Sequence, residues 1–348
     1  MIPDRLPVPS VSRRTIRNLR SELATSLLAK VGIALVLLVV FVAVFAPFLA
    51  PHDPTDQELD DNQLPPIGFT NETTVTTSEM VDGEVQIVEE TKTINATWDH
   101  PLGTDPLGRD VLSRVIYGAR TSLLVGVLGT ALAAIIGVTV GLVAGYYGGR
   151  IDDSLMRVAD VMLAFPSLVL AIALVGVIGT AAYRIPDPFV SAGFADGMPE
   201  YTVLPGTVVL VVALVTWVWF ARVARSEAMS VRQQEYVKAA KSMGAGDAFV
   251  IRKHVFPNSI TPILVLATIQ IAALILLESA LSFLGFSGTT LSWGFDIAQG
   301  RGYLSSSWWI ATMPGLAIVL TVIGINLIGD WLRDALDPGI QGEGGGGA

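Results

Sequence analysis

The side chains that could carry out chemistry are few, and they form no recognisable catalytic set. The chain has no cysteine, and its three histidines, His52, His100 and His254, lie far apart and match no metal-ligand spacing. No phosphate-binding GxxxxGK[ST] loop and no GxSxG nucleophile turn stands in a suitable context. We therefore expect no catalytic residue, no metal site and no nucleotide hydrolysis by this chain itself.

Three polar side chains inside long apolar stretches are candidates to contact a solute. Glu278 stands near the end of one stretch, where an ionised carboxylate is costly unless it is paired or faces water. A protonated or interface-exposed glutamate is the alternative. Gln270 and Asn326 also lie within apolar stretches, where they either contact cargo or hydrogen-bond between helices. These three residues are the predicted translocation pathway.

The elements around these residues are those of a membrane protein. Of the 348 residues, 51% are hydrophobic and 15% are charged, a combination that soluble domains rarely tolerate. Apolar windows of about 20 residues, enough to cross a bilayer, occur six times. They are residues 31–50, 123–146, 161–183, 203–221, 260–278 and 311–329. We predict an all-α membrane protein with six transmembrane helices.

The distribution of Lys and Arg predicts the orientation of these spans. Several cations precede the first span, and a second cluster lies between the fourth and fifth spans. Because cytoplasmic loops carry an excess of Lys and Arg, both termini should be cytoplasmic. The protein is then a multi-pass component of the cell membrane, with the connector 148–157 inside and the loops 184–201 and 281–307 outside.

This layout divides the chain into five parts. They are a cytoplasmic N-terminal segment (1–30), the first transmembrane helix (31–50), an extracytoplasmic acidic loop with an amphipathic helix (51–120), a five-helix core (121–333) that contains a cytoplasmic loop (222–258), and a flexible glycine-rich cytoplasmic tail (334–348). In the amphipathic helix, Asp110, Arg114 and Arg120 should reach water while its apolar residues face the bilayer.

The outer loop contains an insertion of uncertain structure. Residues 70–97 are rich in threonine and alternate with Val, Ile and Met, which indicates either a strand pair or a disordered segment. Asn71 and Asn95 each begin an acceptor sequon for glycosylation. The acidic residues concentrated in this loop suit either a solubility device or adaptation to high salt.

Prolines and tryptophans mark further features of the apolar segments. Pro166 and Pro205 lie within or near spans, where a missing backbone donor favours a kink. The tryptophans Trp293, Trp308 and Trp309 lie outside the sixth span, where we expect them to act as interfacial aromatic anchors.

The cytoplasmic segment 235–258 is the most informative part of the chain. Residues 236–243 have good helix formers, Gly244 and Gly246 favour a turn, and residues 248–255 resume a helix before Pro257 opens the next span. The prediction is a helix-turn-helix on the membrane surface, with the small residues Ala239, Ala240 and Gly244 exposed for close approach of a protein. Attraction of its cations to anionic lipid is the alternative.

This segment resembles the EAA loop of binding-protein-dependent ABC importer permeases. The family pattern is EAA, a glycine four residues later, and a distal Pro-Asn. The matching residues here are Lys238, Ala239, Ala240, Gly244, Ala245, Gly246, Pro257 and Asn258. Lys238 replaces the glutamate of the pattern, which removes any ion pair made through that acid.

Further motifs resemble the C-type permease subunits of dipeptide, oligopeptide and nickel importers. They occur in order along most of the chain. They include Leu102-Gly103-Thr104-Asp105, Leu107 to Arg114, Tyr117 to Ser122, Gly145 to Gly149, Asp160 to Pro166, Leu281 to Gly285, Ser292-Trp293-Gly294 and Gly329 to Pro338.

The resemblance implies the type I ABC importer permease fold and a transport role without catalysis. It also implies that the helix-turn-helix containing the eight residues named above couples the permease to an ATPase subunit. It further implies two ABC ATPase subunits that bind ATP-Mg, a homologous B-type permease subunit and an extracellular solute-binding protein, with no nucleic acid as partner and no cofactor on this chain. Peptides are the expected cargo, with nickel or another solute as the alternative. An ion-coupled secondary transporter is the alternative from another class, but it would need midplane ion ligands or interrupted helices that are not evident here.

Overall fold

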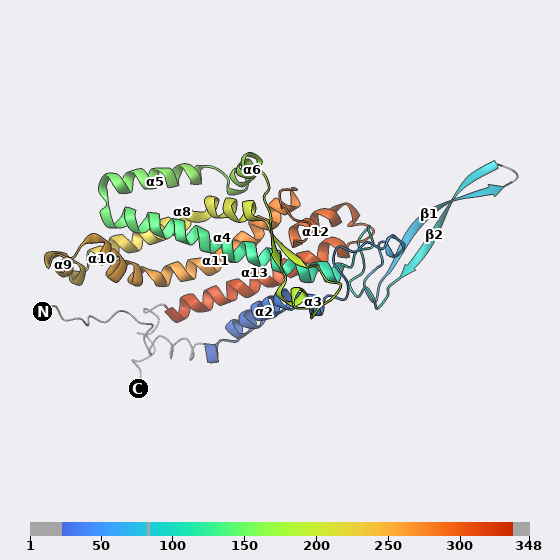
Figure 1. Ribbon diagram of the computed structural model, residues 1–348, viewed down its shortest axis with the longest axis horizontal. Helices are drawn as coiled ribbons and strands as arrows, with labels where there is room; N and C mark the ends of the chain where they lie inside the picture. The colour runs from blue at the N-terminus through green and yellow to red at the C-terminus, as the bar shows by residue number, and fades with distance from the viewer. Residues whose placement is uncertain (1–22, 82–83, 337–348) are drawn as a thin grey trace, which may run out of the picture.

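The computed structural model describes residues 23–81 and 84–336 as an elongated helical bundle (Figure 1). Residues 1–22 of the predicted N-terminal segment and residues 337–348 of the predicted flexible tail lie outside the described residues. Five helices within the described ranges are long and apolar enough to cross a membrane. They are α2 (Leu27–Val44), α4 (Val111–Tyr147), α8 (Gly206–Arg232), α11 (Phe256–Phe283) and α13 (Trp309–Leu336).

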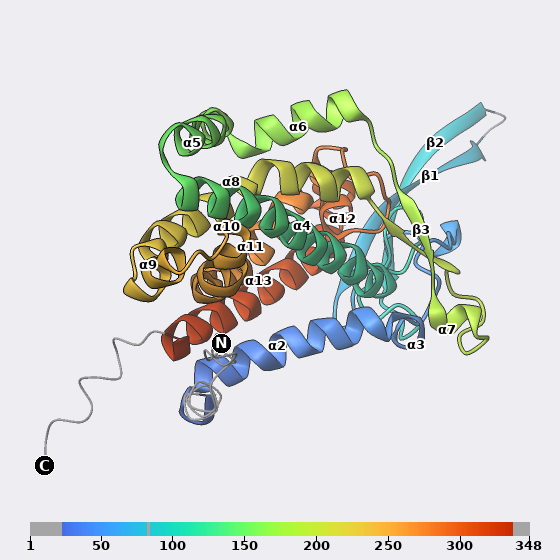
Figure 2. The ribbon, with the colours of Figure 1, turned by 60° about the vertical axis from the view of Figure 1, so that its left-hand side comes forward.

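The third predicted span is not one straight helix. Its residues are divided between α5 (Gly149–Ala164) and α6 (Ser167–Ile178), which meet at an angle of 95°. Phe165 is extended (φ −94°, ψ 138°) because the ring of Pro166 disfavours helical backbone at the residue before it. Pro166 also has no backbone N–H to donate to the preceding turn. The bent pair lies along one side of the bundle (Figure 2). Pro166 therefore marks a sharp break, whereas Pro205 only precedes the first residue of α8.

Helices α4 and α8 approach closely along a glycine stripe. Gly137, Gly141 and Gly145 recur every four residues and so share one face of α4. A Cβ at Gly137 or Gly141 would stand 2.2 Å from a carbonyl oxygen of α8, that of Trp217 or Ala221 respectively. Small residues at this spacing let two membrane helices pack backbone to backbone. The stripe fixes α8 against α4 and so determines where the segment after α8 begins.

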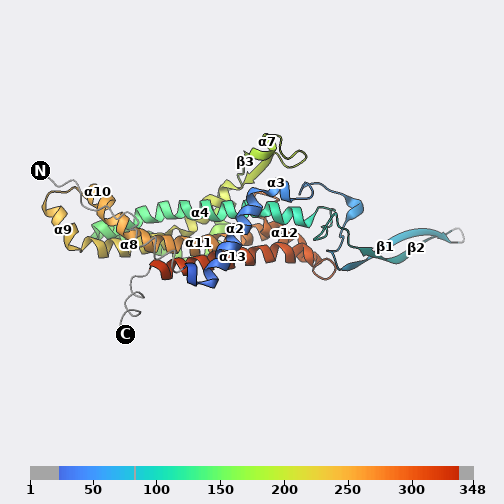
Figure 3. The same cartoon turned by 90° about the horizontal axis from the view of Figure 1, so that it is seen from below.

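One end of the bundle carries short irregular elements and a long hairpin. The short elements are α3 (Ala46–Leu49), η1 (Leu59–Asp61), β3 (Tyr183–Pro186), α7 (Pro188–Ser191), β4 (Tyr201–Leu204), α12 (Trp293–Gly300) and η3 (Arg301–Tyr303). Strands β1 (Thr70–Val81) and β2 (Glu84–Asn95) pair antiparallel from Thr70 opposite Asn95 to Val81 opposite Glu84. The insertion is therefore a strand pair, and it projects beyond the bundle (Figures 1 and 3).

The two sequons of this hairpin differ in accessibility. Asn71 is buried, and its Nδ2 donates a hydrogen bond of 3.1 Å to the carbonyl of Gln63. Asn95 is exposed. Because glycosylation needs a free amide nitrogen, the folded protein offers only the second of these two sites.

Residues 111–120 are helical as predicted, but their predicted role as a separate amphipathic helix on the bilayer surface is wrong. These residues are the first turns of α4, and Asp110 is its N-cap, whose side chain accepts from the backbone N–H of Ser113. Asp110 and Arg114 are buried, and the Arg120 guanidinium pairs with Asp187. Asp110 and Arg114 are shielded from water and Arg120 nearly so, because loops at the hairpin end of the bundle cover the start of α4.

Candidate functional site

A short two-helix segment joins α8 to α11 at the end of the bundle opposite the hairpin (Figure 3). It comprises α9 (Glu235–Ser242), α10 (Asp247–Val250) and a π-helical turn, η2 (Ile251–Val255), that runs directly into α11. The predicted helix, turn and second helix are confirmed. We call residues 235–258 the coupling segment, after the role that the sequence suggests for it.

Gly244 ends α9 in a backbone conformation that residues with a side chain rarely adopt. Its φ of +83° is the left-handed conformation, which L residues other than glycine adopt at a cost. The N–H of Gly244 donates to the carbonyl of Lys241 at 2.9 Å, and the N–H of Ala245 donates to that of Ala240 at 3.1 Å. These two bonds form a Schellman motif, which satisfies carbonyls left free at the helix end. Gly244 thus fixes the reversal between α9 and α10.

Pro257 and Asn258 stand where the coupling segment enters the span. Pro257 lacks a backbone donor and lies in the first turn of α11, where the helix tolerates it. Asn258 Nδ2 donates to the carbonyl of His254 at 2.6 Å and so occupies an acceptor in the π-helical turn. Such turns accommodate one extra residue in a helix and often occur at functional positions.

One face of the coupling segment packs inward and the other stays open. Val237, Val250 and Val255 are each no more than 1% exposed and join the hydrophobic core formed with α4 and α8. Ala240 is also buried, so the expectation that it is open to a partner is wrong. The open face carries Lys238, Ala239, Met243, Gly244 and Phe249. Met243 is 76% exposed and Phe249 50% exposed, which leaves apolar area beside the cations.

Polar contacts tie the coupling segment to the long helix α4. The Tyr146 hydroxyl donates to Asp247 Oδ1 at 2.6 Å, and Lys241 Nζ lies 3.5 Å from the same carboxylate oxygen. The Lys241 ammonium also sits 4.5 Å from the centre of the Tyr146 ring. Sequence reasoning missed Tyr146 and Asp247 because their contact joins residues about a hundred positions apart. Lys238, in contrast, pairs with Glu235 of its own helix at 2.8 Å.

The three predicted pathway residues do not line one surface in this structure. Glu278 is 1% exposed and accepts from the hydroxyls of Ser122 at 3.1 Å and Ser282 at 2.6 Å. Gln270, on the same helix, is buried, and its Nε2 has no hydrogen-bond partner within the described residues. Asn326 lies on α13 and is exposed. Glu278 instead stands at a contact between α4 and α11.

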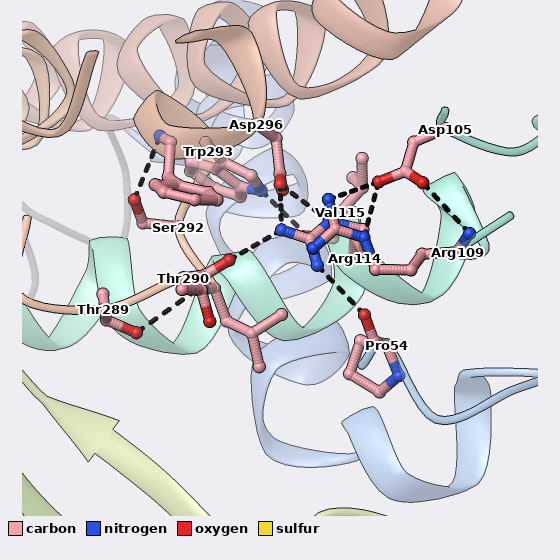
Figure 4. Close-up of polar contacts among 12 residues, drawn as sticks. Pro54, Asp105, Arg109, Arg114, Val115, Thr289, Thr290, Ser292, Trp293 and Asp296 are labelled. Atoms are coloured by element: carbon pink, nitrogen blue, oxygen red, sulfur yellow. Dashed lines mark hydrogen bonds and ion pairs between the residues drawn. The ribbon is translucent and has the colours of Figure 1, made fainter. Parts of the chain in front are cut away.

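At the opposite end of the bundle, a buried ion pair joins α4 to α12 (Figure 4). Arg114 Nε donates to Asp296 Oδ1 at 2.8 Å, and the same guanidinium donates to the carbonyls of Pro54 at 3.0 Å and Thr290 at 2.6 Å. Burial acts to raise the pKa of the Asp296 carboxyl, and the charge of Arg114 acts in the opposite direction. Arg114 thus ties together three loop or helix segments at the hairpin end of the bundle. We call the group of Pro54, Arg114, Thr290 and Asp296 the clasp.

Two tryptophans extend this clasp instead of anchoring a span at the membrane surface. Trp293 is 1% exposed and donates its indole N–H to the carbonyl of Val115 at 2.9 Å. Trp309 is 2% exposed and donates in the same way to the carbonyl of Thr104 at 3.0 Å. The predicted interfacial role is wrong for both residues because the outer loops cover their rings.

Comparison with known proteins gives a consistent result. Residues 137–342, more than half of the chain, match the family described as binding-protein-dependent transport system inner membrane component. Residues 20–66 match the N-terminal transmembrane domain of oligopeptide transport permease C. The chain is similar over 89% of its length to the di/tripeptide transport system permease protein DppC of Pseudomonas aeruginosa, with 36% identity and 88% of that protein covered.

Two further proteins were found to be similar to this chain. The probable D,D-dipeptide transport system permease protein DdpC of Escherichia coli is 34% identical over 89% of this chain and 87% of its own. Among solved structures, one of the MetNI methionine ABC transporter in an inward-facing conformation aligns with a TM-score of 0.49 and 15% identity, over 64% of this chain and 97% of that one.

Proposed function

The chain belongs to the family of binding-protein-dependent transport system inner membrane components, and from this premise we propose how it works as a permease subunit of an ABC importer. It is a multi-pass membrane protein, and it contributes a pathway while separate subunits hydrolyse ATP. Its cargo is a dipeptide or a short oligopeptide. The observation that supports this cargo is the extent of the similarity, since relatives named for dipeptide or peptide transport match most of the chain at 34–36% identity.

The coupling segment is the surface on which one ATPase subunit docks. It combines a rigid glycine reversal with an open face that holds both apolar area and cations. Its inner face is continuous with the core shared by α4 and α8, so that a push on the open face is carried to two spans. The homologous B-type permease presents the equivalent segment to the second ATPase, and ATP-Mg binds on those subunits alone.

Both termini lie on the cytoplasmic side in this proposal. The start of α2 and the end of α13 point toward the end of the bundle that holds α9 and α10, whereas the hairpin projects from the other end (Figure 1). The end with α9 and α10 carries many Arg and Lys side chains, including Arg222, Arg225 and Arg232, as expected of the cytoplasmic side. The hairpin end then faces the extracellular solute-binding protein.

Glu278 becomes part of the pathway only when α4 separates from α11. In this structure its carboxylate is held by serines, so it contacts no open space. A rocking motion that moves these two helices apart would expose it to the passing solute. Glu278→Gln keeps the volume and removes the charge, and it should slow uptake while the basal ATPase rate is retained. Equal uptake by Glu278→Gln and wild type would contradict a role for Glu278 in the pathway.

The test of the proposed function is uptake by the reconstituted complex. The chain is purified in mild detergent with its copurifying subunits, which are then identified, and the complex is placed in vesicles with ATP on the cytoplasmic side. We expect a second permease, two ATPases and a solute-binding protein, and ATP-dependent accumulation of a labelled dipeptide. An active homo-oligomer without any ATPase would contradict the proposal, and uptake of nickel without uptake of peptide would contradict the cargo.

A further inference from the structure

Two of the three histidines meet at the outer end of the bundle, although they are far apart in sequence. His52 lies just after α3, and His100 lies in the loop that leads into α4. Their ring centroids are 4.5 Å apart. The spacing of the histidines along the chain predicts no metal site, yet folding places these two rings together beside the carboxylate of Asp110.

The hydrogen bonds in this cluster leave one nitrogen without a partner. His100 Nδ1 lies 3.0 Å from Asp110 Oδ1, and the other oxygen of Asp110 accepts from the backbone N–H of Ser113 at 2.7 Å. The backbone N–H of His52 donates to the Ser113 hydroxyl at 3.1 Å, which holds the His52 backbone in place. The ring Nδ1 of His52 is buried and has no hydrogen-bond partner within the described residues. Buried polar atoms in folded proteins normally have a partner, so an unpaired ring nitrogen indicates a bound ion or water at this position.

The separation of the donor atoms suits a metal ion. One ligand atom from each of His52, His100 and Asp110 lies within 4.8 Å of the other two. In a tetrahedral zinc site with bonds of about 2.0–2.1 Å, ligand atoms stand roughly 3.3 Å apart. The donor atoms of His100 and Asp110, 3.0 Å apart, are already near that separation, and a ring nitrogen of His52 lies within 4.8 Å of both. His100 and Asp110 are 5% and 2% exposed, which holds two of the three ligands rigidly.

We propose that His52, His100 and Asp110 bind a divalent transition metal ion, with Zn²⁺ as the best fit to two imidazoles and one carboxylate. Water fills the fourth position. Asp61, whose carboxylate oxygen lies 3.9 Å from His100 Nε2, adds negative charge close to the ion. Glu58 and Asp61 form another group around His100, but Glu58 is exposed, and the buried set is the site.

The bound ion would join three separate segments of the outer surface. His52 follows α3, His100 follows the hairpin, and Asp110 caps the first turn of α4. The ion thus stabilises the base from which the hairpin projects. This role is structural, and it is independent of which solute the protein carries.

The test uses the full chain, purified in detergent without a polyhistidine tag. Zn²⁺ binding is measured by competition with a chromophoric chelator, and Co²⁺ is added separately because its absorption spectrum reports the coordination number. Wild type should bind one Zn²⁺ per chain at this site and give the strong visible bands of four-coordinate Co²⁺. His52→Gln should weaken Zn²⁺ binding at least tenfold and remove those bands. The choice of His52 avoids misfolding, since its Nδ1 supports no hydrogen bond among the described residues.

His254→Gln is the matched control, because this third histidine lies in the coupling segment at the other end of the bundle. It should bind Zn²⁺ as wild type does. The proposal is overturned if wild type gives no four-coordinate Co²⁺ spectrum. It is equally overturned if His52→Gln and His254→Gln bind Zn²⁺ with the same affinity, which would indicate scattered surface binding.

Discussion

The hydroxyl of Tyr146, at the inner end of α4, donates a hydrogen bond of 2.6 Å to Oδ1 of Asp247, the first residue of α10. This bond joins the coupling segment to the longest helix of the bundle, which continues to the clasp at the outer end. A displacement of the coupling segment is therefore carried to α4 directly, in addition to its passage through α11. The segment is therefore continuous with α8 and α11, packs on the core formed with α4 and α8, and is joined to α4 by this polar contact as well.

Removal of this bond should weaken coupling without loss of the fold. Tyr146→Phe keeps the ring that packs in the core and deletes only the hydroxyl. We expect ATP-dependent uptake to fall about two- to thirtyfold relative to ATP hydrolysis, which corresponds to the roughly 0.5–2 kcal/mol typical of changes along a coupling network. Tyr147→Phe is the control, because the neighbouring Tyr147 is 47% exposed. A ratio of uptake to hydrolysis that is equal in the two variants would show that the bond plays no part in coupling.

Substitution of Gly244 should separate a backbone effect from a surface effect. Gly244→Val places a β-branched residue at φ +83°, which disfavours the reversal by roughly 1–2 kcal/mol and should uncouple hydrolysis from uptake. Gly244→Asn tolerates the left-handed conformation, and a Cβ here meets no atom within 4 Å. If only the reversal matters, uptake survives in Gly244→Asn. Loss of uptake in both variants indicates close approach of a partner, and unchanged uptake in both contradicts the docking site.

The glycine stripe predicts a stability effect that is specific to one face of α4. In Gly141→Ala the new methyl group would stand 2.2 Å from the carbonyl oxygen of Ala221, so the two helices must move apart. Overpacking of this kind costs about 1–3 kcal/mol, which should lower the unfolding temperature in detergent. Gly176→Ala in α6 is the control, because its Cβ would meet no atom within 4 Å. A similar unfolding temperature for the two variants would contradict backbone contact between α4 and α8.

The buried ion pair between Arg114 and Asp296 should contribute far more to the free energy of unfolding than an exposed ion pair does. Arg114→Met leaves the Asp296 carboxylate buried without its partner, a change that costs about 3–5 kcal/mol. In the exposed pair of Arg222 and Asp160, whose side chains are 47% and 62% exposed, Arg222→Met should cost at most about 1 kcal/mol. Chemical unfolding in detergent measures both. The double variant Arg114→Met/Asp296→Leu should recover part of the loss, and an equal cost for the two single variants would contradict the assignment.

Local patterns predicted much of the fold. The apolar windows located five of the helices, since the backbone of a run of about 20 apolar residues in a bilayer must satisfy its hydrogen bonds internally, as a helix does. Gly244 and Pro257 predicted the turn and the helix entry of the coupling segment, because both act through the backbone of their own neighbours. The 95° bend between α5 and α6 was harder to foresee, because a proline sets a break but not its angle.

The sequence by itself determined the class of this protein, the place of its spans and the position of the coupling segment, since composition and near-neighbour spacing decide these. Only the tertiary structure decided which charged side chains are buried and which residues they contact. Arg114 was expected in water and is paired with Asp296, and Glu278 was expected on the translocation pathway and is enclosed by serines. The contact between the His52 and His100 rings was likewise decided by the tertiary structure. Each depends on contacts between distant segments, and chain spacing carries no information about which surfaces the packed helices bring together.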